Sequence, residues 1–325
     1  MKSRERREAT LRVGIVGAGR TRNGLGPFLA RAFERQGCVV TGVVGRDAGR
    51  TEANAVALAS ALGHRVAAYP DLTSLCVSGI DALVIASPPD AHVAALEAAA
   101  DRGIACLCEK PVCNAADVQR AVLALLSFAE RGALVTENVQ WPENLPVLEA
   151  LHGAWEMGSL RRVEMGLSPI SADPREMLED SLPHLLSLVF AIAGLQHGDA
   201  MELEQVRTVR AAPGRVALEA RFVAPACTVE ACLELVQHVE QPRPAWFAID
   251  GRRADRSIGA DYAIHFRAGD REFRVEDPMQ RLVAGFVRNC KVPASGMRDV
   301  QRASMAHAVA TRLSLWHRIM SLTFD

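Results

Sequence analysis

Strand-like and helix-like segments alternate from residue 11 to residue 136, and this alternation is the strongest constraint on the fold. A short apolar run at 11–16 is followed by a glycine-rich turn and by a segment with apolar residues at helical spacing, 27–36. Further strands are expected at 39–44, 82–86, 104–108 and 134–136, with helices at about 51–62, 91–102 and 115–131. Strands separated by helices of about ten residues or more predict a parallel sheet with helical crossovers.

The turn after the first strand reads Gly17-Ala18-Gly19 and leads into a helix. In that context glycines bring backbone N–H groups close to a pyrophosphate at the helix N-terminus. A third glycine is expected at position 22, which is arginine, and glycines follow at 24 and 26. The loop is therefore longer than usual, or its arginines contact phosphate directly; a strand–helix turn without a ligand is the alternative. The residues expected to contact a dinucleotide here are Gly17, Gly19, Arg20, Thr21 and Arg22.

The end of the second strand bears on which nicotinamide dinucleotide would bind. Sites for the non-phosphorylated form usually place an acid there to bind the ribose hydroxyls, but this chain has Gly45 and Arg46. A glycine leaves room and an arginine can pair with a 2′-phosphate, which favours NADP over NAD. Asp47 follows and could still bind a ribose. The alternative interpretation is that Arg46 is a solvated turn residue.

Two prolines follow the strand at 82–86, in the sequence ASPPDAH. We expect them to form a rigid wall beside the nicotinamide half of the dinucleotide, with Ser87 and Pro88 in contact with the cofactor. His92 lies on the next helix and is interpreted as a hydrogen-bonded helix-end histidine rather than a cofactor contact.

Lys110 is one of only three lysines among 37 basic residues, the others being Lys2 and Lys291. It follows the strand at 104–108 in the sequence LCEKPVC, and the carboxyl ends of parallel strands form the edge where ligands bind. Lysine, unlike arginine, can lose its proton when its surroundings shift its pKa. We therefore interpret Lys110 as a functional residue and Glu109 as a neighbour of the cofactor. The alternative is an ordinary surface lysine.

The pattern changes after about residue 140, where strand-like runs follow one another with turn signals between them. Such a succession is typical of an antiparallel sheet. The runs are expected at 161–167, 202–211, 215–223, 227–236, 245–250 and 261–267, with helices at about 145–156, 182–192, 279–290 and 297–320. The prediction is an α/β protein in which a Rossmann-type parallel sheet occupies domain 1–140. Domain 141–325 would be an α+β substrate-binding and dimerisation domain with an open, mainly antiparallel sheet.

The helix expected at 182–192 is preceded by Asp180 and Ser181. Ser181 resembles an N-cap and Pro183 a first-turn residue, so Asp180 would lie just outside the helix and His184 within its first turns. A helix N-terminus disfavours imidazolium, so we expect a neutral His184 that is suited to proton transfer. Taken alone, such a pair is structural more often than catalytic.

Three features together resemble the Gfo/Idh/MocA oxidoreductases over nearly the whole chain: the glycine-rich turn, the sequence EKP, and a D-x-x-x-H pair in a second domain with an open sheet. The resemblance implies that Lys110, within EKP, lies at the reacting carbon and helps to bind the substrate oxygen. It implies that Asp180 and His184 match the family's aspartate and histidine, with His184 as acid/base. It also implies NAD(P)-dependent hydride transfer between a secondary alcohol and a ketone on a small polyol, sugar or cyclic substrate.

The chain departs from the family pattern at several positions. Leu182 and Ser187 stand where the family often has glycine and aspartate, and the segment ENVQWPEN lacks the usual arginine. These positions line the substrate pocket, so the substrate can differ from the usual sugar or inositol. Two alternatives therefore stay open. One is a relative of lyase or glycosidase type that retains its nucleotide, and the other is a non-catalytic nucleotide-binding sensor.

The counts of charged residues and cysteines limit the kinds of partner that this protein is expected to have. With 37 basic and 38 acidic residues and no long basic run, nothing indicates a nucleic-acid partner. The opening MKSRERREAT does not resemble a signal peptide and no apolar run is long enough to cross a bilayer, so a cytoplasmic location without a membrane partner is expected. The eight cysteines lack zinc-site spacing, so no metal is expected. An open sheet face needs covering, which predicts a homo-oligomer, a dimer or a tetramer.

Overall fold

Short apolar runs in the first half of the chain form a six-stranded sheet in which every pair of neighbouring strands is parallel. The structure, a computed structural model, describes residues 10–19, 25–154, 160–195, 199–259, 263–292 and 297–324. The strands are β1 (Arg12–Val16), β2 (Val39–Val44), β3 (Ala67–Ala68), β4 (Ala82–Ile85), β5 (Ala105–Cys108) and β6 (Val135–Glu137). Their order is β3-β2-β1-β4-β5-β6. Successive strands are added on one side of β1 up to β3 and on its other side from β4 onward, so the topological switch point lies between β1 and β4. The predicted Rossmann-type sheet is confirmed.

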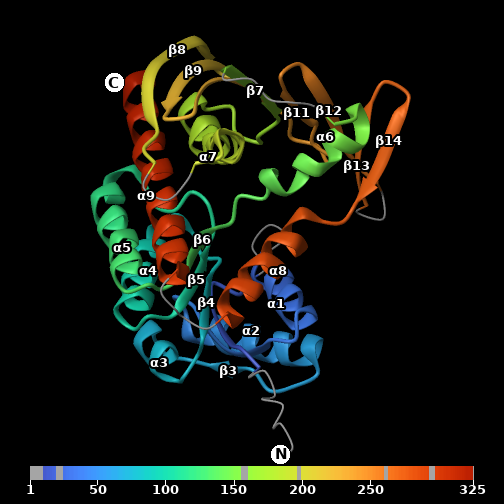
Figure 1. The fold of residues 1–325 in the computed structure, drawn as a ribbon. Coiled ribbons are helices and arrows are strands. Elements are labelled where there is room, and N and C mark those ends of the chain that lie inside the picture. The colour runs from blue at the N-terminus through green and yellow to red at the C-terminus, as the bar shows by residue number, and fades with distance from the viewer. Residues whose placement is uncertain are drawn as a thin grey trace, which may run out of the picture. The chain divides into compact units, whose positions relative to one another are not determined.

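Helices connect these strands and flank the sheet (Figure 1). They are α1 (Leu25–Arg35), α2 (Ala48–Leu62), α3 (Leu72–Val77), α4 (His92–Asp101) and α5 (Val118–Glu130), with short 3₁₀ turns η1 (Pro89–Ala91) and η2 (Ala115–Asp117). Helix α2 begins three residues earlier than predicted because the Asp47 side chain caps it, accepting a hydrogen bond of 2.7 Å from the Arg50 N–H. It ends at Gly63, which has a φ of 79°.

The second half of the chain forms an eight-stranded sheet in the order β14-β13-β12-β11-β7-β10-β9-β8. The strands are β7 (Leu160–Leu167), β8 (Glu202–Ala212), β9 (Arg215–Ala224), β10 (Cys227–Val236), β11 (Ala245–Ile249), β12 (Arg252–Ile258), β13 (Ile264–Ala268) and β14 (Arg271–Val275). All neighbouring pairs are antiparallel except β7 and β10, which are parallel. The predicted mainly antiparallel sheet is confirmed.

Two strands of this sheet, β12 and β14, are missing from the prediction. Within the sequence DGRR only Asp250 and Gly251 form the turn, with φ values of 50° and 77°, and β12 starts at the next residue. Two consecutive residues with positive φ form the tight turn that matches the twist of a hairpin. Gly269, with a φ of 57°, lies in the corresponding turn between β13 and β14. Both missed strands are rich in arginine, which hid their period-two alternation.

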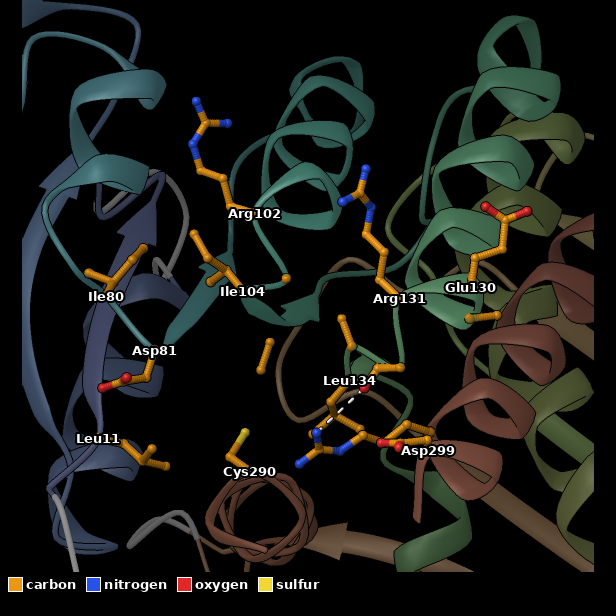
Figure 2. A pocket seen from close by; sticks show the side chains of 16 residues that line it. Leu11, Ile80, Asp81, Arg102, Ile104, Glu130, Arg131, Leu134, Cys290 and Asp299 are labelled. Carbon is orange, nitrogen blue, oxygen red and sulfur yellow. Dashed lines mark hydrogen bonds between the residues drawn. The ribbon is translucent and has the colours of Figure 1, made fainter. Parts of the chain in front are cut away.

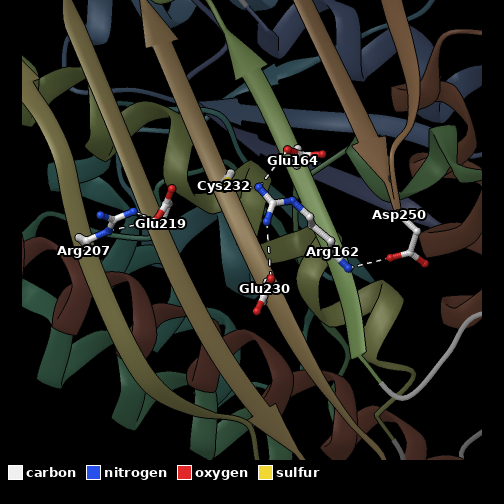
Figure 3. Close-up of polar contacts among 7 residues, drawn as sticks. All are labelled: Arg162, Glu164, Arg207, Glu219, Glu230, Cys232 and Asp250. Atoms are coloured by element: carbon white, nitrogen blue, oxygen red, sulfur yellow. Dashed lines mark hydrogen bonds and ion pairs between the residues drawn. The ribbon is translucent and has the colours of Figure 1, made fainter.

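Helices cover one face of the second sheet, and the other face carries charged side chains. Helix α7 (Pro174–Ala193) packs on β7, β9 and β10, and α6 (Leu145–His152) on β12, β13 and β14. On the uncovered face, Arg207 pairs with Glu219 on the next strand, and Arg162 pairs with Glu164 and Glu230 (Figure 3). These exposed ion pairs, within and between strands, make the uncovered face polar.

The chain divides into two compact units. The first unit comprises residues 1–138 and 283–307, and the second comprises residues 139–282 and 308–325. Helix α8 (Pro278–Lys291) carries the chain back into the first unit, where Phe286 packs edge-on against Phe33 of α1 at 5.8 Å between ring centroids. Helix α9 (Met297–Phe324) contributes to both units. None of the helices in the described ranges combines the length and the apolar character that crossing a bilayer requires.

Candidate active site

The carboxyl edge of the first sheet is held together by backbone hydrogen bonds that continue the strand ladder into the loops. The N–H of Gly17 donates to the carbonyl of Val44 at 2.9 Å, and the N–H of Ala86 to that of Val16 at 2.8 Å. The N–H of Glu109 donates to the carbonyl of Ile85 at 2.9 Å. The loops after β1, β4 and β5 therefore lie side by side. This brings the predicted residues Gly17, Ser87, Pro88, Glu109 and Lys110 to one edge.

Gly17 is required by the contact between the first two of these loops. Its φ is 85°, and a Cβ atom there would lie 2.6 Å from the backbone N and Cα of Ser87. Gly26, in α1, takes the packing role of the third glycine, because a Cβ atom there would lie 2.8 Å from Ala18 Cα and from the Gly17 carbonyl oxygen. The helix thus approaches the turn closely despite the longer loop. The predicted contacts Arg20, Thr21 and Arg22 lie outside the described residues.

The loop after β4 offers an unsatisfied hydroxyl. Ser87 Oγ is buried and has no hydrogen-bond partner among the described residues. A buried polar atom without a partner costs free energy unless a ligand or water satisfies it. Together with the close backbone approach at Gly17, this hydroxyl fits a dinucleotide at the edge, with Gly17, Gly19 and Ser87 as the residues that would hold it.

His92, the first residue of α4, connects two of the loops. It is fully buried, with Nδ1 3.0 Å from the Pro111 carbonyl oxygen and Nε2 2.7 Å from that of Ser87. Burial lowers the pKa of His92, so the neutral ring donates one of these hydrogen bonds, depending on its tautomer. This agrees with the interpretation of a hydrogen-bonded helix-end histidine, and it ties the loop after β4 to the loop after β5.

The end of β2 carries an exposed ion pair. Arg46 pairs with Asp90 of η1, and both side chains are more than half exposed. Asp47 is occupied by the cap of α2 and lies 3.7 Å from the Arg50 guanidinium. The carboxylate that could have bound a ribose is therefore used by the helix, whereas the Arg46 guanidinium remains open to solvent.

The acid of the EKP sequence is held in an unusual environment. Burial raises the pKa of Glu109 to about 7, and a hydrogen bond donated by Asn138 Nδ2 and the charge of Lys110 only partly offset that rise. Asn138 is buried, and its N–H donates to the Cys108 carbonyl at 2.7 Å, so the loop after β6 fixes the amide against Glu109. A carboxyl that can hold a proton near neutral pH therefore lies next to Lys110 in the chain.

Glu109 is expected to make stability depend on pH. Its pKa is about 7 in the folded protein against an ordinary 4.5, so between these values the folded state holds a proton that the unfolded state releases. Stability falls as pH rises through this window, by about 3 kcal/mol for the full shift, and the loss is complete above the folded pKa. Glu109→Gln removes this decline in the free energy of unfolding measured by urea titration at about pH 5 and about pH 8. The exposed Glu52→Gln is the control, and equal pH slopes in the wild type and Glu109→Gln would contradict the assignment.

In the second unit, Asp180 and His184 lie four residues apart on α7, and therefore on one face of the helix. Asp180 is exposed and His184 half-buried. The predicted helix start is wrong: α7 begins at Pro174, where the Asp173 side chain accepts a hydrogen bond of 2.9 Å from the Glu176 N–H. His184 therefore lies well past the first turn, and the argument from the helix N-terminus does not apply to it.

The same correction applies to the residues around the pair. Ser181 is a buried helix residue rather than a cap, and Pro183 lies inside the helix rather than in its first turn. The overlooked signal was the sequence DPRE, which has a capping aspartate, a proline at the first helical position and an acid in the first turn. A proline in a helix interior normally removes one backbone hydrogen bond, and burial of the helix against the sheet compensates for the loss.

Two side chains near His184, Trp141 and the Arg256 that contacts it, were not among the predicted site residues. The Trp141 ring, in η3 (Trp141–Asn144), meets the His184 ring edge-on at 6.5 Å and packs against Phe247 and Phe266. The guanidinium of Arg256 lies over the Trp141 ring, 5.2 Å from the ring centroid. The sequence contained Trp141 in the altered segment ENVQWPEN, but only tertiary packing shows that it contacts His184.

A cavity of about 630 Å³ opens at the opposite, amino edge of the first sheet (Figure 2). It is lined by residues at the starts of strands, such as Asp81 and Ile104, and by Arg102 and Arg131 at the ends of helices. Arg302 reaches it but donates to the Gly132 carbonyl at 3.4 Å. No predicted site residue lines this cavity. The described residues also contain no cluster of three or more His, Cys, Asp or Glu side chains that could hold a metal ion.

The strand order and the glycine-rich turn define the first unit as a dinucleotide-binding Rossmann fold. Residues 11–138 match the sequence model of the Gfo/Idh/MocA oxidoreductase family, which is described by its NAD-binding Rossmann fold. The predicted resemblance to this family is confirmed over residues 11–138.

A curated relative extends the similarity. The chain is 32% identical over 165 residues to inositol 2-dehydrogenase of Rhizobium meliloti strain 1021. The matched stretch is 51% of this chain and 46% of that enzyme, so the match spans about half the length of the curated relative.

Solved structures share the fold over nearly the whole chain. An inositol dehydrogenase homologue from Azotobacter vinelandii, solved with NAD⁺, has a TM-score of 0.65 at 16% identity, covering 96% of this chain and 95% of its own. UDP-N-acetylglucosamine 3-dehydrogenase from Acidithiobacillus ferrooxidans has a TM-score of 0.63 at 19% identity, covering 96% and 99%. A 3-ketoreductase from Actinomadura kijaniata, solved with TDP-benzene and NADP, has a TM-score of 0.60 at 17% identity, covering 96% and 98%. At these identities the likeness establishes the fold.

Proposed function

We propose that this protein is an NAD(P)-dependent oxidoreductase that interconverts a secondary alcohol and a ketone on a small polyol, sugar or cyclic substrate. The observation that carries the proposal is the arrangement at the carboxyl edge of the first sheet. There the close-packed turn at Gly17 and the Ser87 hydroxyl, which has no hydrogen-bond partner among the described residues, adjoin the loop of Lys110. The similarity to inositol 2-dehydrogenase, and the presence of UDP-N-acetylglucosamine 3-dehydrogenase among the structural neighbours, support the substrate class.

Three residues carry the proposed chemistry. The bound nicotinamide supplies or accepts the hydride. Lys110 binds and polarises the substrate oxygen, His184 gives or takes the proton of the hydroxyl, and Asp180, four residues before it on α7, orients the histidine or a substrate hydroxyl. Trp141 packs on the edge of His184 and restricts its ring, which favours one orientation for proton transfer.

NADP is the cofactor that we favour. Asp47 is occupied at the start of α2, and Arg46 presents an exposed guanidinium whose partner, Asp90, is itself exposed. A 2′-phosphate can replace Asp90 as the anion beside Arg46, because phosphate accepts two parallel hydrogen bonds from a guanidinium. NAD carries a neutral hydroxyl in place of the 2′-phosphate, so it gains much less binding free energy from Arg46.

Arg46→Ala tests the cofactor preference. The variant is expected to bind NADPH about 10-fold or more weakly, which is the usual loss for a hydrogen bond to a charged group, while NADH affinity changes little. Thermal-shift titration with each nucleotide measures both affinities. Arg50→Ala is the matched control, because Arg50 is also exposed and lies next to Asp47. An unchanged NADPH-to-NADH affinity ratio in Arg46→Ala would overturn the preference.

We further propose that the protein is a homo-oligomer, a dimer or a tetramer, that associates through the uncovered face of the second sheet. This face alternates basic and acidic side chains on neighbouring strands, as with Arg207 beside Glu219 and Arg221 near Glu204 (Figure 3 shows the first pair). A face of alternating charge is complementary to a second copy of itself across a two-fold axis.

Nucleotide release distinguishes the proposed reaction from the alternatives. A dehydrogenase exchanges its nucleotide and consumes it in proportion to product. A lyase-type relative would purify with bound nucleotide and show no net oxidation or reduction of it. A sensor would bind nucleotide and stay inactive across a panel of alcohols and ketones. Thermal-shift titration with NADPH and NADH, followed by such a panel under the better nucleotide, separates the three outcomes.

A further inference from the structure

Strand β12 places Arg256 on the helix-covered face of the second sheet, among buried apolar side chains. Arg256 pairs in register with Ala245 and Phe266, and two residues before it Ala254 pairs with Phe247. Because alternate residues of a strand share a face, Arg256 points to the same side as these buried side chains. Ala254, Phe247 and Phe266 are all fully buried.

The Arg256 guanidinium has no anionic partner among the described residues. It lies over the Trp141 ring, its Nε is buried without a hydrogen-bond partner, and the neighbouring charge is another cation, Arg243. Burial and Arg243 lower the pKa of Arg256 to about 10, so the group still carries its charge at neutral pH. A buried charge without a counter-charge is costly, and an anion brought by a ligand would offset that cost.

Arginines on the opposite face of the same sheet show the contrast. Arg162 lies 3.2 Å from a carboxylate oxygen of Glu164, and Arg207 pairs with Glu219 (Figure 3). On β12 itself, Arg253 points outward, stacks on Trp246 at 4.0 Å and pairs with Asp255 at 2.7 Å. The exposed arginines, which need a partner least, have carboxylates, and the half-buried Arg256 has none among the described residues.

Arg256 is partly exposed and adjoins the proposed proton carrier. The neighbouring cation, Arg243, donates a hydrogen bond of 3.4 Å to the Ser168 carbonyl. The Trp141 ring contacts both Arg256 and His184, so only one indole ring separates them.

We propose that Arg256 binds an anionic group of the substrate, a carboxylate or a phosphate ester. Resting on the proposed function, this assigns the substrate to acidic derivatives of sugars or polyols rather than to neutral ones. The planar guanidinium binds either oxyanion through two parallel N–H···O bonds, and stacking on Trp141 holds its plane in place. With the anion fixed at Arg256, a hydroxyl of the same molecule can reach His184.

Arg256→Met tests the proposal, because methionine keeps an unbranched apolar stem over Trp141 and removes the charge. The activity readout is kcat/KM for matched pairs of ketone substrates that differ only by an acidic group, one pair carrying a carboxylate and one a phosphate ester. The wild type is expected to prefer the acidic member. The preference is expected to fall about 10-fold or more in Arg256→Met, mainly through KM. The pair with the larger loss identifies the anion.

A binding readout keeps the test independent of turnover. Inorganic phosphate, compared with chloride at equal ionic strength, is expected to raise the Tm of the NADPH-bound wild type more than that of Arg256→Met. Arg256→Lys keeps the charge without the planar fork, so it retains part of the phosphate response and serves if the methionine variant does not fold. Arg253→Met is the matched control and responds like the wild type.

Three results would overturn the proposal: an unchanged phosphate response in Arg256→Met and Arg256→Lys, an unchanged acidic-to-neutral preference in Arg256→Met, or an equal loss in Arg253→Met. Failure of the proposed reaction looks different, because no substrate of either charge would then turn over in the wild type while the phosphate response persisted.

Discussion

His184→Ala and Lys110→Ala are each expected to reduce kcat by about 10² to 10⁴-fold, the usual contribution of positioned acid–base groups. Nucleotide affinity is expected to change only a few-fold in His184→Ala, because its part is proton transfer to the substrate. Steady-state kinetics and thermal-shift titration with NADPH measure the two quantities separately.

Matched controls exist for both variants. His152 is an exposed histidine of α6 whose Nε2 contacts the Arg253 carbonyl at 2.9 Å, and Lys291 is an exposed lysine whose Nζ lies 3.5 Å from the Gln36 carbonyl. His152→Ala and Lys291→Ala are expected to keep wild-type kcat. Near-wild-type activity in either His184→Ala or Lys110→Ala would remove that residue from the proposed chemistry.

Gly17→Ala is expected to lower nucleotide affinity by about 100-fold or more, or to prevent folding of the first unit. Two effects combine at this position. A residue with a Cβ atom at φ 85° costs about 1–2 kcal/mol, and the Cβ atom would in addition lie 2.6 Å from the Ser87 backbone. The loops after β1 and β4 would have to separate, and both the turn and the Ser87 hydroxyl would leave their positions.

Gly63→Ala separates the two effects. Gly63 has a similar φ of 79°, but a Cβ atom there meets nothing within 4 Å. This variant therefore carries the backbone strain alone and is expected to lose about 1–2 kcal/mol of stability while nucleotide affinity stays unchanged. Circular dichroism reports folding, and NADPH titration reports affinity. If both variants lost only this stability and both kept their affinity, the turn would not hold the nucleotide.

The first sheet could be predicted from the sequence because its signals are local. Buried parallel strands appear as continuous apolar runs, as at Val39–Val44, where the predicted and observed bounds coincide. The two-residue strand Ala67–Ala68 has too few residues to produce a pattern. In the second sheet, the strands Arg252–Ile258 and Arg271–Val275 were missed because arginine occupies many of their positions. Their hairpin turns, with Asp250-Gly251 in one case, were the stronger signal.

The candidate site likewise contains residues that the sequence predicts and residues that only tertiary packing brings together. Gly17, Ser87 and Lys110 follow strands directly, so their gathering at one edge follows from the parallel order alone. Trp141 and Arg256 lie 115 positions apart in the chain, and no local pattern indicates that one stacks on the other. The reason for expecting a neutral His184 was wrong because one helix start was misplaced, although the spacing of Asp180 and His184 was sufficient to place them on one face.

The most direct test of the central claim is hydride transfer itself. The protein is incubated with NADPH deuterated at the transferable position of the nicotinamide and with a panel of ketone sugars and polyols, and products are analysed by mass spectrometry. The account predicts one deuterium in the product alcohol for each NADPH consumed, and about 10² to 10⁴-fold slower appearance of this product when His184→Ala replaces the wild type. Tight NADPH binding with no deuterium in any product, or cleavage of a substrate with no net consumption of nucleotide, would contradict it.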